Sequence, residues 1–181
     1  MQMDQDVAEV LVTAEQLQRR IAELGQEVTR DYAVLNPVLV CVLRGAVIFV
    51  ADLMRHLDMQ FEIDFMAISS YGGRQTESTG VVRILMDLST NIESRHVLIV
   101  EDIIDTGRTL SYMMQNLQTR RPASIKVCTL LDKPTRRLVY VPIAYLGFKI
   151  PDKFVVGYGL DFDEHYRNLP YVGVLKPEKY A

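Results

Sequence analysis

The sequence predicts an α/β protein in which helices flank a parallel sheet. Apolar segments of strand length alternate with segments of helical spacing through the middle of the chain, and this alternation is typical of βαβ units. Several strand segments are continuously apolar, as parallel strands covered on both faces are. The 181 residues show no repeat, low-complexity tract or linker, so we expect a single domain over residues 1–181.

The first predicted elements are a helix, a buried strand and a second helix. A capping box, T-A-E-Q at residues 13–16, begins the first helix, and apolar residues at helical spacing continue it to about Arg30. Residues 37–43 are continuously apolar and predict a buried strand, and residues 46–57 predict a helix. Residues 61–68 alternate in part, which predicts a strand with one more polar face.

The next segment, residues 69–80, has the sequence S-S-Y-G-G-R-Q-T-E-S-T-G and no apolar periodicity. Loops of this length are commonly functional lids or disordered segments. Strands are predicted at residues 81–88, 97–100 and 125–131, and a helix with one apolar face at residues 110–117. The C-terminal remainder contains several prolines and glycines and predicts short strands and turns.

Composition narrows the class of protein. Apolar residues make up 49% of the chain and charged residues 24%, which is ordinary for a globular protein. The net charge of −3 argues against a dedicated nucleic-acid binder, which needs a basic surface. Cys41 and Cys128 lie in apolar runs and are expected to be reduced core residues. We find neither a signal peptide nor an apolar run of the ~18 residues that span a bilayer, so we expect a cytoplasmic protein.

The stretch V-L-I-V-E-D-I-I-D-T-G-R-T-L, residues 97–110, carries the clearest chemical signal. It places a small-residue turn between a strand and a helix, where ligands of open α/β sheets bind. Gly107 allows a strained turn and a close approach by a ligand, so the amides of residues 105–109 can form an anion site at the helix N-terminus. Thr106 and Thr109 add hydroxyl donors, which makes the turn a candidate phosphate cradle. The plainer alternative is a strand–helix turn with an Asp cap.

Three acids, Glu101, Asp102 and Asp105, lie between this strand and the turn. Ionised carboxylates are costly to bury, so a functional reason is expected. The pair Glu101 and Asp102 could accept hydrogen bonds from a sugar diol and hold Mg²⁺ directly or through water. Asp105 lies between the diol and the phosphate, where it could accept a proton from an incoming nucleophile.

This stretch resembles the ribose-phosphate signature of the type I phosphoribosyltransferases, and its Asp105 is similar to the branch that acts on 6-oxopurines. The resemblance extends over residues 38–175. It implies a parallel-sheet phosphoribosyltransferase core at about residues 12–150, with a small hood from the N-terminal residues and residues 151–181. The implied phosphoribosyl pyrophosphate site comprises Glu101, Asp102, Asp105, Thr106, Gly107, Arg108 and Thr109, although position 108 is variable in the family and adds no weight.

The resemblance also implies a pyrophosphate site and a lid. Arg44 and Gly45, in L-R-G-A, match the pyrophosphate loop, and Arg167 matches an arginine that grips pyrophosphate. Ser70 and Tyr71 open the segment that resembles the mobile lid. Taken alone, each of these residues could belong to an ordinary surface turn.

For the purine, the resemblance implies a second group of residues. Lys133 matches a lysine that contacts the exocyclic oxygen, although a solvated basic turn is the plainer explanation of D-K-P-T-R-R. Phe154 matches the aromatic residue that stacks on the base, and Val155 belongs to the backbone that reads the purine edge. Asp161 is placed beside the purine and Mg²⁺, with Glu101 and Asp102 as the other metal-side acids.

These matches imply transfer of a phosphoribosyl group to hypoxanthine and guanine, with Mg²⁺ as cofactor and a homodimer or homotetramer as the assembly. No nucleic-acid or membrane partner is expected. A regulatory RNA-binding relative is a rival hypothesis, which the acidic charge and Lys133 disfavour. A different base is another rival: Lys133 disfavours adenine, because an ammonium has donors and no acceptor, whereas xanthine shares the 6-oxo group and stays open.

Overall fold

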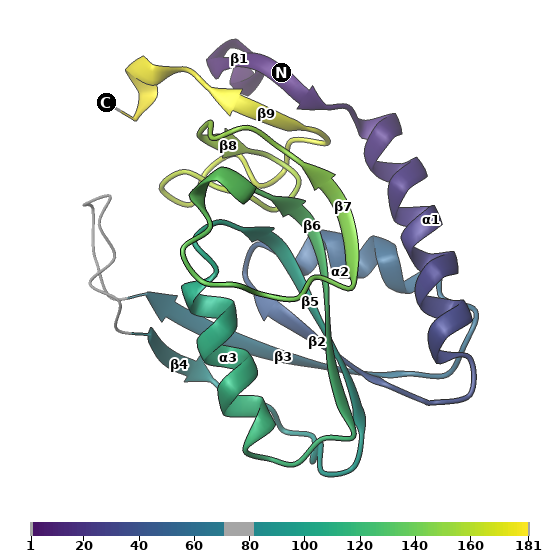
Figure 1. The fold of residues 1–181 in the computed structure, drawn as a ribbon. Coiled ribbons are helices and arrows are strands. Elements are labelled where there is room, and N and C mark those ends of the chain that lie inside the picture. The colour runs from purple at the N-terminus through teal and green to yellow at the C-terminus, as the bar shows by residue number, and fades with distance from the viewer. Residues whose placement is uncertain (1, 71–81, 181) are drawn as a thin grey trace.

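The computed structural model describes residues 2–70 and 82–180, and in this part of the chain two β-sheets are present (Figure 1). The larger sheet has the strand order β4-β3-β2-β5-β6-β7. Its strands are β2 (Val38–Leu43), β3 (Glu62–Ser70), β4 (Val82–Met86), β5 (His96–Ile104), β6 (Ser124–Asp132) and β7 (Tyr145–Lys149). All neighbouring pairs are parallel except β3 and β4, which confirms the predicted parallel sheet.

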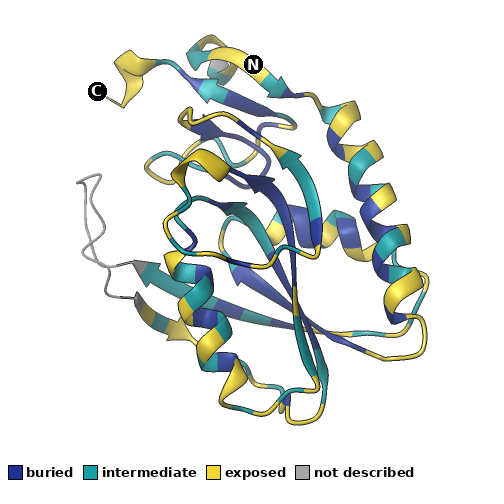
Figure 2. Ribbon diagram, in the orientation of Figure 1, coloured by how far each residue is buried: buried dark blue, intermediate teal, exposed yellow. Residues whose placement is uncertain are grey.

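Helices cover both faces of this sheet. Helices α1 (Ala14–Tyr32) and α2 (Val47–Met54) pack on one face, and α3 (Arg108–Gln118) packs on the other (Figure 1). Alternate residues of β2 point to opposite faces, so Leu39 joins the α1–α2 core while Val40 joins the α3 core. Both are buried, in agreement with the continuously apolar sequence of this strand (Figure 2).

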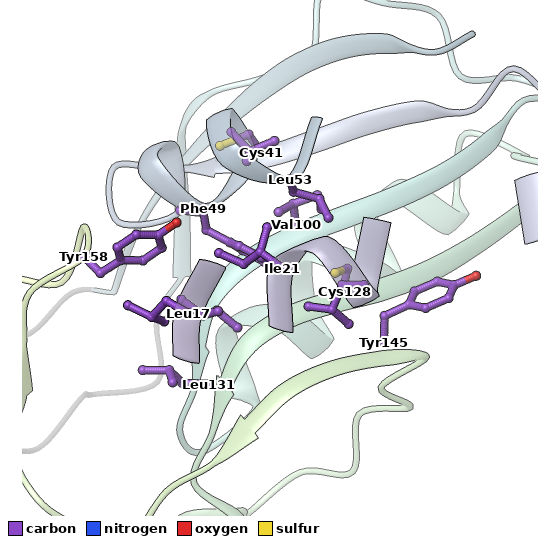
Figure 3. Packing of buried hydrophobic residues seen from close by; sticks show 14 of the residues in the cluster. Leu17, Ile21, Cys41, Phe49, Leu53, Val100, Cys128, Leu131, Tyr145 and Tyr158 are labelled. Carbon is purple, nitrogen blue, oxygen red and sulfur yellow. The ribbon is translucent and has the colours of Figure 1, made fainter. Parts of the chain in front are cut away.

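The α1–α2 core explains the helical spacing seen in the sequence. Leu17 and Ile21 of α1 and Phe49 of α2 are fully buried against the sheet, where Val100 and Cys128 also lie (Figure 3). The capping box at the start of α1 is formed, with Thr13 and Gln16 bonding to each other's backbone amides. Both cysteines are free and buried, as predicted.

A smaller antiparallel sheet lies beside the larger one and combines the two ends of the chain (Figure 1). It has the order β1-β9-β8, with β1 (Val7–Val12), β8 (Val155–Val156) and β9 (Val172–Leu175). Short 3₁₀ helices cover residues Gln2–Asp6, Pro134–Arg136 and Pro177–Lys179. No helix among the described residues is long and apolar enough to cross a bilayer.

Several predicted boundaries were wrong. Strand β5 does not stop at residue 100 but continues to Ile104, because Glu101, Ile103 and Ile104 still pair with β6, so Glu101 and Asp102 belong to the strand and Asp105 follows it. Helix α2 ends at Met54 rather than residue 57, and α1 runs to Tyr32. Strand β3 continues to Ser70, and the rest of the predicted lid, with Tyr71, lies outside the described residues.

Candidate active site

The turn after β5 has the backbone expected of a phosphate cradle. Gly107 caps α3 with φ +81°, in the left-handed region that favours glycine. A Cβ atom there would also come within 2.5 Å of the Val139 carbonyl oxygen, so no other residue fits without rearrangement. The amides of Thr106 and Gly107 make no hydrogen bond with the part of the chain that the structure describes, which leaves them available to an anion.

Two adjacent cavities are present at the carboxyl ends of the strands. The first, of about 140 Å³, is lined by Glu101, Ile103, Ile104, Asp105, Thr106, Gly107, Thr109 and Leu110. The second, of about 330 Å³, is lined by Arg44, Gly45, Asp102, Ile103, Asp105, Lys133, Phe154, Val155, Leu160, Asp161 and Arg167. Asp105 lines both cavities, and its side chain is 41% exposed. Arg136 Nε lies 2.9 Å from Asp105 Oδ1.

The acid pair at the end of β5 has unusual electrostatics. Burial raises the pKa of Glu101 well above its usual range, and the charge of Asp102 raises it further. Burial also raises the pKa of Asp102, although its hydrogen bond from the Ile103 amide favours the ionised form. The Oε2 atom of Glu101 is buried and has no hydrogen-bond partner within the described residues, so it is a free acceptor for a cation or a hydroxyl.

The β2–α2 turn packs tightly against this pair. A Cβ atom at Gly45 would overlap the Asp102 carboxylate, so glycine is required there. The peptide bond between Leu43 and Arg44 is cis. Arg44 and Arg167 share one carboxylate, that of Glu164, at 2.8 and 3.1 Å, so the two arginines lie close together where they line the second cavity.

Asp161 contacts both Arg167 and Glu164. Its carboxylate lies 2.9 Å from Arg167 Nη2 and accepts a hydrogen bond from the Glu164 amide. No group of three or more metal-ligating side chains occurs within residues 2–70 and 82–180, so a cation at this site would draw its other ligands from substrate or water.

Lys133 is buried rather than solvated. It is 6% exposed, and its Nζ donates a hydrogen bond of 2.7 Å to the Lys153 carbonyl oxygen. Burial lowers its pKa, while the nearby Asp105 and Asp152 oppose this effect. The plainer explanation, a solvated basic turn, is therefore wrong.

Phe154 is 39% exposed and lies in an aromatic cluster. Its ring stacks on Tyr180, with centroids 4.8 Å apart and an interplanar angle of 23°, and meets Phe162 edge-on at 5.6 Å. Phe154 and Val155 both line the second cavity, so a flat ring could enter beside them.

Comparisons with known proteins agree on one family. The model of the phosphoribosyl transferase domain matches residues 9–163. A hypoxanthine-guanine phosphoribosyltransferase of Streptococcus thermophilus is 52% identical to this chain, over 98% of each. The chain belongs to the hypoxanthine-guanine phosphoribosyltransferase family. It is thus an enzyme of purine salvage, a glycosyltransferase that uses a phosphoribosyl donor.

Solved structures of the family agree with the fold as well. A hypoxanthine phosphoribosyltransferase of Staphylococcus aureus superposes with a TM-score of 0.96 at 50% identity, covering 100% of this chain and 98% of its own. A hypoxanthine-guanine-xanthine phosphoribosyltransferase has a TM-score of 0.87 at 48% identity, covering 95% of this chain and 99% of its own.

Not every residue expected from the family resemblance reaches the cavities. Arg108 is exposed and lines neither of them. Ser70 ends β3, and Tyr71 lies outside the described residues. Conversely, Glu164, Arg136 and Tyr180 contact site residues although the sequence predicted no role for them. The spacing of Glu164 three residues before Arg167 could have pointed to Glu164, but nothing local marks the other two.

Proposed function

We propose that this protein transfers ribose 5-phosphate from phosphoribosyl pyrophosphate to N9 of hypoxanthine or guanine, with release of pyrophosphate. The observation that carries the proposal is the position of Asp105 on the wall shared by the two cavities. The first cavity has the free amides and glycine turn that suit a 5′-phosphate. The second has the buried lysine and the aromatic face that suit a 6-oxopurine, and the two arginines that suit pyrophosphate.

Different residues of the site bind different parts of phosphoribosyl pyrophosphate. Amides and hydroxyls of Thr106, Gly107 and Thr109 hold the 5′-phosphate at the start of α3. Glu101 and Asp102 accept hydrogen bonds from the ribose hydroxyls. Arg44 and Arg167, after exchanging Glu164 for the ligand, bind the pyrophosphate oxygens.

Mg²⁺ is the cofactor that this donor set fits. The acid pair is buried and offers an unpaired oxygen at Glu101, and Mg²⁺ commonly binds through one or two carboxylates together with substrate phosphates. Asp161, which faces Arg167, is a third acid on the metal side of the cavity. When bound, Mg²⁺ neutralises charge on the pyrophosphate leaving group.

In the transfer itself, purine N9 attacks C1′ of the ribose and the C1′–O bond to pyrophosphate breaks, with the electron pair leaving on pyrophosphate. Asp105 accepts the proton from purine N7, after it gives up its ion pair with Arg136. Lys133 donates a hydrogen bond to the 6-oxo group, which leaves adenine without a matching acceptor.

Xanthine is the second candidate base. It shares the 6-oxo group, and one solved relative carries xanthine in its name alongside hypoxanthine and guanine. Xanthine differs from hypoxanthine and guanine at C2, which we place beside Val155 in the second cavity. We give hypoxanthine and guanine priority because the relative from Streptococcus thermophilus is named for these two bases.

Product formation tests the proposal directly. The enzyme is incubated with phosphoribosyl pyrophosphate, Mg²⁺ and each of hypoxanthine, guanine, xanthine, adenine and uracil, and nucleotide is measured by chromatography. Nucleotide from hypoxanthine or guanine is expected. Product from adenine alone would contradict the assigned role of Lys133, and product from uracil alone would contradict the proposed function.

Replacement of Asp105 tests the proton transfer. Asp105→Asn should retain binding of phosphoribosyl pyrophosphate and lose roughly 10²–10⁴-fold in kcat, as for other general bases. An unchanged kcat would remove Asp105 from this role.

The remaining expectations belong to the same proposal. We propose one functional domain over residues 1–181, with a core at about residues 12–150 and a hood from the terminal segments that form β1, β8 and β9. We also propose a cytoplasmic homodimer or homotetramer whose partners are the small-molecule substrates rather than nucleic acid or membrane. Sedimentation equilibrium distinguishes the two assemblies.

A further inference from the structure

Arg137 contacts the main chain of the phosphate-binding turn and is not among the residues that line the first cavity. Its Nε donates a hydrogen bond of 3.2 Å to the Asp105 carbonyl oxygen, and its Nη2 lies 3.5 Å from the Ile104 carbonyl oxygen. The same Nη2 pairs with the carboxylate of Asp132. The side chains of Arg137 and Asp132 are only 17% and 8% exposed, so this pair is largely removed from solvent.

These contacts determine which way the peptide groups of the turn face. The C=O and N–H of one planar peptide point in opposite directions. The Asp105 carbonyl shares its peptide with the Thr106 amide, so a carbonyl held by Arg137 turns that amide toward the cavity. The next carbonyl, of Thr106, is held in the same way by the amides of Leu138 and Val139, each at 3.0 Å.

Packing adds to the hydrogen bonds. The Cδ atom of Arg137 would lie 3.0 Å from a Cβ atom at Gly107, so the arginine stem fills the space that the glycine leaves. The main-chain carbonyls of residues 104–106 are thus all satisfied from one side, by Lys133 and by residues 137–139. The amides of Thr106 and Gly107, which follow these carbonyls along the chain, are left for a ligand.

We propose that Arg137 is a positioning residue for the phosphate-binding turn: by holding the carbonyls of Ile104 and Asp105 it orients the amides that bind the 5′-phosphate. Arg137 itself touches no substrate. The inference rests on the proposed function, because it assumes that the turn binds the phosphate of the donor and of the nucleotide product.

The geometry requires a guanidinium. Arginine presents several donors in a planar fork and can bridge two carbonyls and a carboxylate at once, whereas lysine has one ammonium on a flexible stem. Arg137→Lys therefore keeps the charge beside Asp132 but loses the simultaneous contacts. Arg137→Gln loses both the charge and the simultaneous contacts.

Equilibrium binding to two ligands tests the proposal. Isothermal titration measures the affinity of the wild type and of both variants for inosine 5′-monophosphate, which carries the 5′-phosphate, and for Mg²⁺-pyrophosphate, which does not contact the turn. We expect the Kd for the nucleotide to rise roughly 10- to 100-fold in both variants, because one or two charge-assisted hydrogen bonds are lost. The Kd for Mg²⁺-pyrophosphate should change less than about 2-fold.

A matched control separates positioning from stability. Arg120 is also partly buried, pairs with Asp87 at 2.8 Å, and follows the other end of α3. Arg120→Gln should lower the melting temperature while leaving the nucleotide Kd at the wild-type value. If Arg137 only stabilised the fold, its variants would behave in the same way at a temperature where they are folded.

The outcomes are distinct. Variants of Arg137 that are folded by circular dichroism and bind the nucleotide within about 3-fold of the wild type overturn the inference. An equal loss of affinity for nucleotide and pyrophosphate also overturns it, because the effect is then not confined to the turn. A wild-type enzyme that does not bind inosine 5′-monophosphate instead overturns the proposed function. Should Arg137→Gln fail to fold, Arg137→Lys decides the matter alone.

Discussion

Replacement of Asp102 by asparagine should stabilise the free protein while weakening its binding of substrate. The change is isosteric: Oδ1 can still accept the Ile103 amide, and the side chain still fits against Gly45. What it removes is a negative charge beside Glu101. Burial raises the pKa of Asp102 from 3.8 to about 6, which means that the fold holds the ionised form at a cost.

The shift gives the size and the sign of the effect. Two pKa units correspond to about 3 kcal/mol, at about 1.4 kcal/mol per unit. Because the folded protein binds this proton more tightly than the unfolded chain, the free energy of unfolding falls as pH rises from about 4 to about 6, and stays low above that. An asparagine side chain cannot ionise, so the Asp102→Asn variant should be up to about 3 kcal/mol more stable at pH 7.5, with little difference at pH 4.

Urea denaturation without Mg²⁺ at pH 4, 5, 6 and 7.5 measures this difference. Asp163→Asn, at an exposed acid of the C-terminal region, is the control and should change the free energy of unfolding by less than about 0.5 kcal/mol. In parallel, the KM of Asp102→Asn for phosphoribosyl pyrophosphate should rise, since a carboxylate of the proposed ribose and Mg²⁺ site is lost. A variant less stable than the wild type at pH 7.5, or a difference that does not vary with pH, would refute the reasoning.

Two further substitutions test other parts of the site. Gly107→Ala places a Cβ atom at φ +81° and against a carbonyl oxygen, so we expect a loss of about 2 kcal/mol in stability and at least a 10-fold rise in the Kd for inosine 5′-monophosphate, by denaturation and titration. Glu164→Gln removes the carboxylate that Arg44 and Arg167 share, so the Kd for Mg²⁺-pyrophosphate should fall by about 2- to 5-fold, as expected for two exposed ion pairs. Asp163→Asn is the control for the loss of one negative charge. An equal fall of the Kd for Mg²⁺-pyrophosphate in both variants would contradict the idea that Glu164 competes with pyrophosphate for the two arginines.

The sequence predicted the central sheet because its strands are buried on both faces. Val40 and Val100 lie on such strands and have no solvent contact. Because neither face of these strands meets water, the sequence shows an uninterrupted apolar run. The end of β5 was not predictable in the same way. Glu101 extends the strand through its pairing with Thr129, a residue distant in sequence, and a carboxylate gives no strand signal of its own.

Without the family resemblance, the candidate site was predictable where one turn supplies several groups, and not where distant segments meet. Asp105 and Gly107 stood out because they are close together in sequence. Arg136 and Arg137 are adjacent and chemically identical, yet one points to the Asp105 carboxylate and the other to main-chain carbonyls. Which of the two arginines makes which contact depends on the path of residues 133–139 over the turn, and the local sequence does not indicate that path.

The second cavity depends on contacts between the two sheets. Lys133 follows β6 of the larger sheet, but its ammonium is held by the carbonyl of Lys153, which directly precedes Phe154 and β8 of the smaller sheet. The Lys153 side chain in turn pairs with Glu9 of β1, at the other end of the chain. In the proposed site, a purine that bonds to Lys133 and stacks beside Phe154 would contact both sheets. Its recognition would then require that the two chain ends come together in one small sheet beside the core.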